Sequence, residues 1–312
     1  MFSGRRISRD EGQQYLRNLV RLFLIHLVSA LAGDIEAIHQ LRVYGRRLRV
    51  ALPLLAVKPA GKRVRRARRL LRGVIRAAGA SRDRDVSLEL LETGLTGHPQ
   101  ITREGRALRA RLRNSARLAR KRLPRQLLGT DIYRLRTALR VMLGRCVPRE
   151  EALARITPLC NAEREILHAE LPEQGQRFEP VKLHGLRRRL RRLRYAAEFQ
   201  DQMMDRKTGA AAMFRRMQTQ LGQMHDHWVL AQWLQAQGES SMQRGQPQLA
   251  LAARRLRLHV LKSAHERHRE WLEENPAQQL ESALWPMTAV VPHMQAAEEA
   301  GDDTTLHQSG HG

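Results

Sequence analysis

The chain has 312 residues and a formal net charge of +25, because 56 Lys and Arg side chains outnumber 31 Asp and Glu. Its length can support one large hydrophobic core or two smaller ones. Aromatic residues make up only 4%, and the abundance of Leu, Ala and Arg favours helix over sheet. Cys146 and Cys160 are too few for a disulfide framework, so a reducing compartment is expected. The cationic excess predicts a polyanionic partner: nucleic acid, an anionic membrane surface or a phosphate polymer.

The first apolar segment spans residues 15–32 and follows a short polar lead at residues 1–14. Its apolar residues recur at helical spacing, although Arg21 and His26 interrupt the run. The small residues at its end resemble those of a signal peptide, but the interruptions and the persistent helical period favour a core helix. The segment is also too short and too charged for a membrane span.

The helix predicted over residues 35–57 carries the most informative pattern. Successive residues of a helix turn by about 100°, so positions three, four and seven apart share a face. Leucines fall on one side of this helix, and the other side carries a cationic stripe formed by His39, Arg42, Arg46 and Arg49. The pattern predicts an amphipathic helix that bends or ends near Pro53 or Pro59.

A further basic helix is predicted from residue 62, and its face at Arg69, Arg72 and Arg76 could widen the cationic surface. Gly79 is predicted to end this helix. Beyond it, a helix at residues 102–126 carries ten basic residues and is an alternative location for an anion site. Helices at residues 132–143 and 150–169 precede a linker marked by Pro and Gly at residues 173–180.

The second half repeats the stripe of the first. Four residues match it position for position, 145 residues later: His184, Arg187, Arg191 and Arg194. Each stripe is followed by a Gly-x-x-(Arg/His)-Asp block that begins at Gly79 or Gly222. The distance from histidine to glycine is 40 residues in the first copy and 38 in the second. Two matched blocks at nearly equal spacing predict a tandem duplication.

The remaining helices of the second half are predicted at residues 181–202, 209–222, 226–237 and 248–274. Arg215 and Arg216 could extend the basic surface there. The matched aspartates, Asp83 and Asp226, are interpreted as helix N-caps or as ion-pair partners of a stripe arginine, with Asp85 as another start for the helix after Gly79.

These motifs resemble those of the CHAD family (conserved histidine α-helical domain). The resemblance rests on His-x-x-Arg-(Val/Arg)-x-x-Arg-Arg-Leu-Arg and the following Gly-x-x-(Arg/His)-Asp-x-x-Val, both present twice, and it runs from about residue 8 to about residue 275. It implies two pseudo-symmetric helical bundles around a basic cavity or surface. It also implies binding of inorganic polyphosphate and association with polyphosphate granules.

We therefore expect an all-α protein of two pseudo-symmetric antiparallel helical bundles, derived from a tandem duplication. The bundles are assigned to residues 15–172 and 181–275, and residues 276–312 to an acidic, partly disordered tail. The expected ligand is inorganic polyphosphate, bound by the two stripes together with Arg69, Arg72, Arg76, Arg215 and Arg216. Neither a cofactor nor membrane insertion is expected, and the expected location is cytoplasmic, at polyphosphate granules.

A metal site is an alternative, because His225 and His227 flank Asp226, and His265 and His268 lie one helical turn apart. Pairs on one helix fall short of the three or four convergent ligands of a transition-metal site. No metal ligand is therefore assigned. As phosphate ligands, histidines would strengthen binding as the pH falls through about 6.5, their ordinary pKa.

A DNA- or RNA-binding protein is the main alternative, since nucleic acids are also phosphate polymers. Proteins that hold single strands commonly stack bases on aromatic side chains, and only Tyr44 and Tyr195 lie near the stripes. A phosphohydrolase is less favoured, because the chain has no Gly-rich phosphate loop with Lys-Ser/Thr and no nucleophile elbow. We expect a binding protein without catalytic residues.

Overall fold

The computed structural model describes residues 4–96, 103–174 and 177–289. Within these ranges the chain forms helices joined by short turns, with no β-strand and an isolated bridge between Ala56 and Cys146. The all-α prediction is confirmed. The helices in chain order are α1 (Gly4–Leu31), α2 (Ile35–Leu55), α3 (Lys62–Thr96), α4 (Arg103–Leu128), α5 (Ile132–Leu143), α6 (Arg149–Ala154), α7 (Ile156–Gln174), α8 (Pro180–Met204), α9 (Ala210–Gln243), α10 (Pro247–Glu273) and α11 (Pro276–Thr288).

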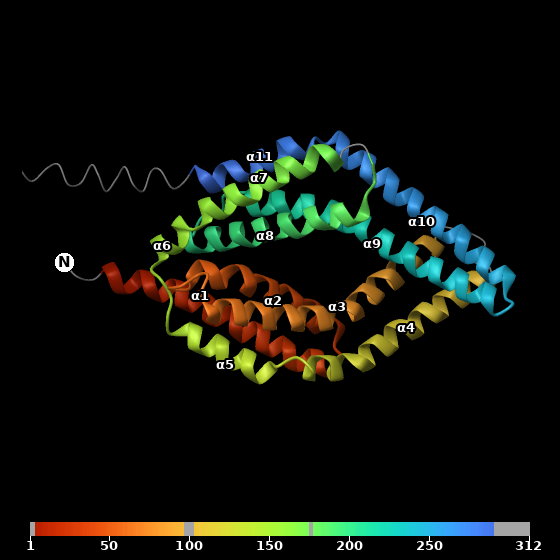
Figure 1. Cartoon of the computed structure of the whole chain (residues 1–312), viewed down its shortest axis with the longest axis horizontal. Helices are drawn as coiled ribbons and strands as arrows, with labels where there is room; N and C mark the ends of the chain where they lie inside the picture. Colours follow the sequence, from red (N-terminus) through yellow and green to blue (C-terminus); the bar gives the residue numbers. More distant parts are fainter. Residues whose placement is uncertain (1–3, 97–102, 175–176, 290–312) are drawn as a thin grey trace, which may run out of the picture.

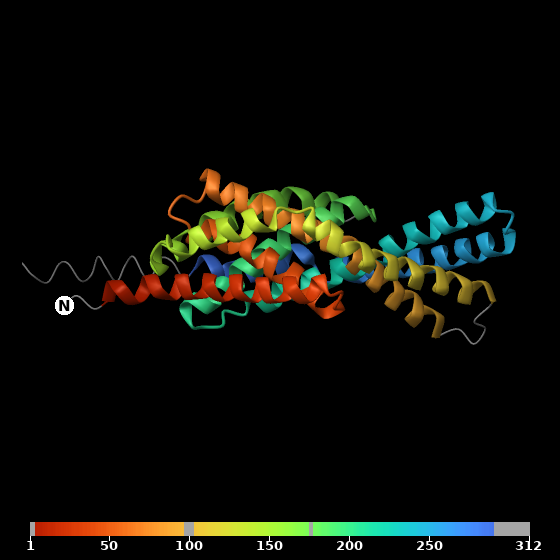
Figure 2. The same ribbon diagram turned by 90° about the horizontal axis from the view of Figure 1, so that it is seen from below.

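Figure 1 shows the helices arranged as two bundles and an arm. α1, α2, α5 and the first half of α3 form the first bundle, and α7, α8, α11 and the first half of α9 form the second. α2 and α8 contact each other where the bundles meet. The C-terminal halves of α3 and α9 leave the bundles and pack with α4 and α10, forming the arm at the right of Figures 1 and 2.

The pair of bundles and the arm each have a hydrophobic core. The bundles share one large cluster of buried apolar side chains, which includes Phe23, Leu41 and Phe199. The arm has a smaller cluster built on leucines such as Leu112 and Leu234. Phe23 lies at the centre of the first apolar segment and is fully buried, so that segment is a core helix, as predicted. No described helix is both long and apolar enough to cross a membrane.

Two predicted helix ends are wrong. α3 runs through Gly79, and α9 runs through Gly222, without interruption. A Cβ atom on Gly79 would lie 3.2 Å from Nη1 of Arg42, and one on Gly222 would lie 3.1 Å from Nη2 of Arg187. These glycines make room for the two guanidiniums. A mid-helix glycine costs only about 1 kcal/mol relative to alanine, which packing readily offsets.

The bundle boundaries differ from the predicted ones. α7 packs against α8 and α11, so residues 173–180 connect two helices of the second bundle, and the chain passes between bundles through α6. α11 also belongs to the second bundle, because Leu280, Leu284 and Met287 are fully buried. α1 begins at Gly4, inside the predicted polar lead. The rest of the predicted acidic tail, residues 290–312, lies outside the described residues.

Candidate functional site

A groove of about 680 Å³ lies between the two bundles, walled by α2 and α3 on one side and α7 and α8 on the other. Helical spacing turns the cationic faces of α2, α3 and α8 toward this space. His184 and Tyr195 also line it. The described residues that line it include nine arginines, here called the arginine groove: Arg46, Arg49, Arg68, Arg72, Arg76, Arg188, Arg189, Arg191 and Arg192.

Two of these arginines are neutralised by α7. Arg189 lies 3.2 Å from the carboxylate of Glu163 and 3.3 Å from that of Glu170, and Arg192 also pairs with Glu163. Glu163 is only 4% exposed, so these pairs fix the α8 wall against α7. In the described part of the chain, no ion pair links the other seven arginines to a carboxylate.

The groove therefore has a surplus of positive charge, which together with burial lowers the pKa of several of its arginines. Burial, then the charge of neighbouring arginines, lowers the pKa of Arg49 to about 10 and that of Arg191 to about 8. Burial and the charge of Arg42 lower the pKa of Arg46 to about 10. The buried Nε atoms of Arg49 and Arg68 have no hydrogen-bond partner within the described structure. Such a site is arranged to accept negative charge from a ligand.

The matched sequence blocks meet where the bundles join. Arg42 donates to the backbone oxygen of Ala78 at 3.2 Å and lies 3.6 Å from the carboxylate of Asp83. The ion-pair interpretation of Asp83 is therefore confirmed, although no helix begins there. In the second half, Arg187 packs on Gly222, and burial raises the pKa of Asp226 to about 6 against the charge of Arg187.

The histidines near this junction are poor bases. Burial and the charge of Arg82 lower the pKa of His39, and burial and the charge of Arg187 lower that of His184 to about 4. The ring of His225 lies 4.4 Å from that of His184, centroid to centroid, and burial and His184 lower its pKa to about 3. In the free protein His184 and His225 are therefore neutral at pH 6.5, where protonation of the stripe histidines had been expected to strengthen binding.

Several predicted site residues lie elsewhere. Arg194 and Arg215 approach the carboxylate of Glu198 at 3.4 and 3.6 Å, and this carboxylate also holds Arg47 of α2 at 2.9 Å. Glu198 thus ties the two bundles together. Arg216 pairs with Glu274 at 2.7 Å, outside the groove. His39, Arg42, Arg69 and Arg187 do not line the groove, whereas Arg46, Arg49, Arg72, Arg76, His184 and Arg191 do.

Four arginines of the groove were not predicted from the sequence: Arg68, Arg188, Arg189 and Arg192. A signal existed for three of them, because Arg68 precedes Arg72 by one helical turn, and Arg188 precedes Arg192 by one turn. Arg188 and Arg192 were missed because the second stripe was defined by matching it to the first. Neither residue matches one of the four positions of the first stripe.

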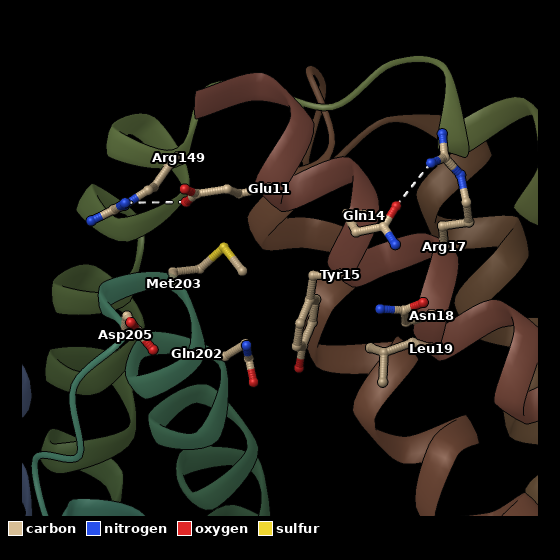
Figure 3. A pocket seen from close by; sticks show the side chains of 10 residues that line it. All are labelled: Glu11, Gln14, Tyr15, Arg17, Asn18, Leu19, Arg149, Gln202, Met203 and Asp205. Atoms are coloured by element: carbon tan, nitrogen blue, oxygen red, sulfur yellow. Dashed lines mark hydrogen bonds and ion pairs between the residues drawn. The ribbon is translucent and has the colours of Figure 1, made fainter. Parts of the chain in front are cut away.

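A second hollow, of about 930 Å³, lies between α1 and α8 (Figure 3). Glu11 and Arg149 form an ion pair in its lining, 3.1 Å apart, and the lining also includes Asp205 and Arg17. Its charges are balanced, so it offers a polyanion far less attraction than the arginine groove does.

The histidine pairs that suggested a metal do not converge with other ligands. His227 Nδ1 lies 2.7 Å from the backbone oxygen of Gln223, and the rings of His265 and His268 pack against Phe178. In the ranges that the structure describes, no group of three or more His, Cys, Asp or Glu side chains could hold a metal ion.

Fold and site together define an all-α protein of two helical bundles with an arginine-lined groove between them. A family model for the CHAD domain matches residues 14–235, and the chain belongs to the CHAD family. The resemblance inferred from the twin motifs is thereby confirmed. The tandem duplication itself stays a prediction.

Two solved structures share this fold. The CHAD domain from the plant Ricinus communis matches with a TM-score of 0.62 and 22% sequence identity, over 91% of this chain and 92% of that chain. PptA from Streptomyces chartreusis matches with a TM-score of 0.64 and 18% identity, over 85% of this chain and 99% of that chain. No curated protein matches the chain.

Proposed function

We propose that this protein binds inorganic polyphosphate in the arginine groove, without hydrolysing it, and associates with polyphosphate granules in the cytoplasm. The observation that carries the proposal is the set of seven groove arginines that no described carboxylate neutralises. A linear polyphosphate carries charge at every unit, so one chain contacts several guanidiniums at once and gains avidity from each. Membership of the CHAD family supports the same ligand.

The groove favours a plain phosphate polymer over nucleic acid. Sequence-tolerant binding of single strands relies on exposed aromatic rings, on which bases stack. Tyr195, the tyrosine that lines the groove, is only 3% exposed. Tyr44 stacks on His26 at 5.3 Å between ring centroids, away from the groove lining. The guanidiniums can thus bind phosphate oxygens, but neither tyrosine offers an exposed ring on which a base could stack.

The test is a titration with long-chain polyphosphate, duplex DNA and single-stranded DNA at equal phosphate concentration and about 150 mM salt, where long-range electrostatics are screened. The groove variant carries Arg46→Glu and Arg191→Glu. The control carries Arg215→Glu and Arg216→Glu, which make the same charge change at residues outside the groove that are 63% and 65% exposed.

We expect wild-type protein and the control to prefer polyphosphate over DNA, and the groove variant to bind polyphosphate more than about tenfold more weakly, a loss above about 1.4 kcal/mol. Equal losses of polyphosphate affinity in both variants would show that binding depends only on the net charge of the protein. Tighter binding of DNA would assign the groove to nucleic acid. Release of inorganic phosphate from polyphosphate, with or without divalent metal, would contradict a purely binding role.

A further inference from the structure

A small cleft of about 300 Å³ lies in the arm, between α3 and α4. It is separate from the arginine groove and shares no lining residue with it. Its polar lining is formed by Arg84, Arg111, Asn114, Ser115, Arg122 and Gln126, here called the arm cleft. Among the described residues that line it, none is acidic.

Two arginines of the arm cleft are held in place by neutral groups. Nε of Arg84 donates to Oγ of Ser115 at 3.2 Å. Arg111 donates to Oγ of Ser241 at 3.0 Å and to Oε1 of Gln246 at 2.7 Å. Such bonds orient a guanidinium but leave its charge uncompensated.

Neighbouring arginines that do not line the cleft are paired with carboxylates instead of neutral groups. Arg113 pairs with Glu92 at 2.7 Å, and Arg120 pairs with Asp85 at 3.0 Å. Asp85 follows Arg84 in the chain but is engaged by Arg120, and Asp83, which precedes it, is engaged by Arg42. These carboxylates thus pair with arginines that do not line the cleft. The positive charge of the arginines that do line the cleft is therefore available to a ligand.

A path of exposed surface connects the two sites along α3. Arg68, Arg72, Arg76, Ala80 and Arg84 follow one another at intervals of four residues. On a helix each such step rotates the position by about 40° and rises about 6 Å. The row therefore winds from the side of α3 that faces α8, across its outer face, to the side that faces α4. Arg72, Arg76 and Ala80 are exposed along this path.

The ends of the path belong to the two sites. Arg76 lines the arginine groove, and Ala80, one turn later, lines the arm cleft. Arg76 and Arg84 are eight residues apart, which corresponds to about 12 Å along the helix axis. A flexible anionic chain that leaves the groove over Arg76 therefore reaches Arg84 without crossing a described acidic side chain of this row.

We propose that the arm cleft is an outer phosphate subsite, occupied by the distal part of a long polyphosphate chain whose other part lies in the arginine groove. This inference rests on the proposed function. A chain too short to span both sites gains nothing from the arm cleft, whereas a longer one gains an intramolecular second contact at high effective concentration. The arm cleft thus makes affinity depend on chain length.

The test compares short-chain and long-chain polyphosphate, each labelled at one end, by fluorescence anisotropy. The arm variant carries Arg84→Gln and Arg122→Gln. The matched control carries Arg254→Gln and Arg255→Gln, which remove the same charge from exposed positions on α10 of the same arm. A single Arg122→Gln variant, changed at an exposed position only, guards against a folding defect.

We expect the arm variant to keep the short-chain affinity of the wild type and to bind the long chain about tenfold more weakly, because one linked contact is lost. The single variant should show a smaller loss of the same kind, and the control should match the wild type. An arm variant that binds both lengths like the wild type, or weakens both equally, overturns the inference. So does a control with the same long-chain loss.

Failure of the proposed function gives a different result. A variant with Arg46→Gln and Arg191→Gln in the groove should lose affinity for both chain lengths. If the wild type binds neither length, or if this variant retains full affinity for both, the proposed function fails regardless of the arm. If the groove variant loses both lengths while the arm variant loses neither, only the outer subsite is refuted.

Discussion

Removing one groove charge should stabilise the free protein and weaken its binding of polyphosphate. Arg191→Met is the change of choice, because methionine retains an unbranched apolar stem of similar course but carries no charge. Burial and the charges of Arg46 and Arg187 hold the pKa of Arg191 at about 8, so the guanidinium is still charged at pH 7. The folded protein is therefore destabilised by burial of this charge and by its repulsion from Arg46 and Arg187.

The size of that cost follows from the neighbours. Two like charges in contact repel by about 1 kcal/mol in water and by about 4 kcal/mol at the effective dielectric constant of a protein surface. Arg191 is partly exposed, so solvent screening keeps the net term near the lower value for each of its two strongest neighbours. We expect Arg191→Met to raise the free energy of unfolding by about 1–2 kcal/mol, or the melting temperature by about 2–5 °C.

The assay is urea and thermal unfolding in low salt, followed by circular dichroism, with polyphosphate binding measured on the same preparations. The gain should shrink near 1 M salt, where the screening length falls to about 3 Å. Polyphosphate should bind about tenfold more weakly, since a charge-assisted contact is lost.

Arg192→Met is the matched control. Arg192 is the next residue of α8 and lines the same groove, but it pairs with the buried carboxylate of Glu163. Its removal should lower the free energy of unfolding by about 1–3 kcal/mol, because that carboxylate loses a partner. If Arg191→Met destabilises the protein as Arg192→Met does, the groove charge is already compensated and the reasoning about a surplus is refuted.

Three further changes test other parts of the site. Gly79→Ala would place a Cβ 3.2 Å from Nη1 of Arg42, which lies outside the groove but whose charge acts on the groove residue Arg46; we expect about threefold weaker polyphosphate binding with unchanged helix content by circular dichroism, and full affinity would show that the position of Arg42 has no effect on the groove. Burial and nearby cations keep the pKa of His184 near 4 and that of His225 near 3, and a bound anion should raise both. Binding should then take up protons and tighten as the pH falls from about 6.5 toward 4; calorimetry in buffers of different ionisation enthalpy measures this uptake, and a pH-independent affinity would exclude it. Glu198→Gln should destabilise the protein by about 2 kcal/mol, because the half-buried carboxylate that ties α2 to α8 is lost; unchanged urea unfolding would mean that other contacts hold the bundles together.

Helical periodicity was sufficient to predict much of the groove. Arg46, Arg49 and Arg191 were assigned because residues three and four apart share a helix face, and this geometry depends only on the helix itself. Which neighbour a side chain meets is a tertiary property. Arg194 occupies an equivalent position in the second stripe but pairs with Glu198, four residues later on the same helix. The other partners of Glu198, Arg47 and Arg215, come from α2 and α9, and those contacts depend on how these helices cross α8.

The glycines show the same limit. Gly79 and Gly222 favour helix ends by local propensity, but both lie inside continuous helices where a guanidinium from another helix needs the space. Likewise, Pro172 and Pro180 indicated the break between α7 and α8 but could not show which bundle α7 joins. Its partners, α8 and α11, lie later in the chain and are brought to it only by packing.

The most direct test of the central claim is an experimentally determined structure of the protein with a polyphosphate chain bound. We predict phosphates along the arginine groove, within hydrogen-bond distance of Arg46, Arg49 and Arg191, at their positions between the two bundles. Phosphates located in the hollow between α1 and α8, or only on the exposed arginines of α4 and α10, would contradict the assignment of this groove as the binding site.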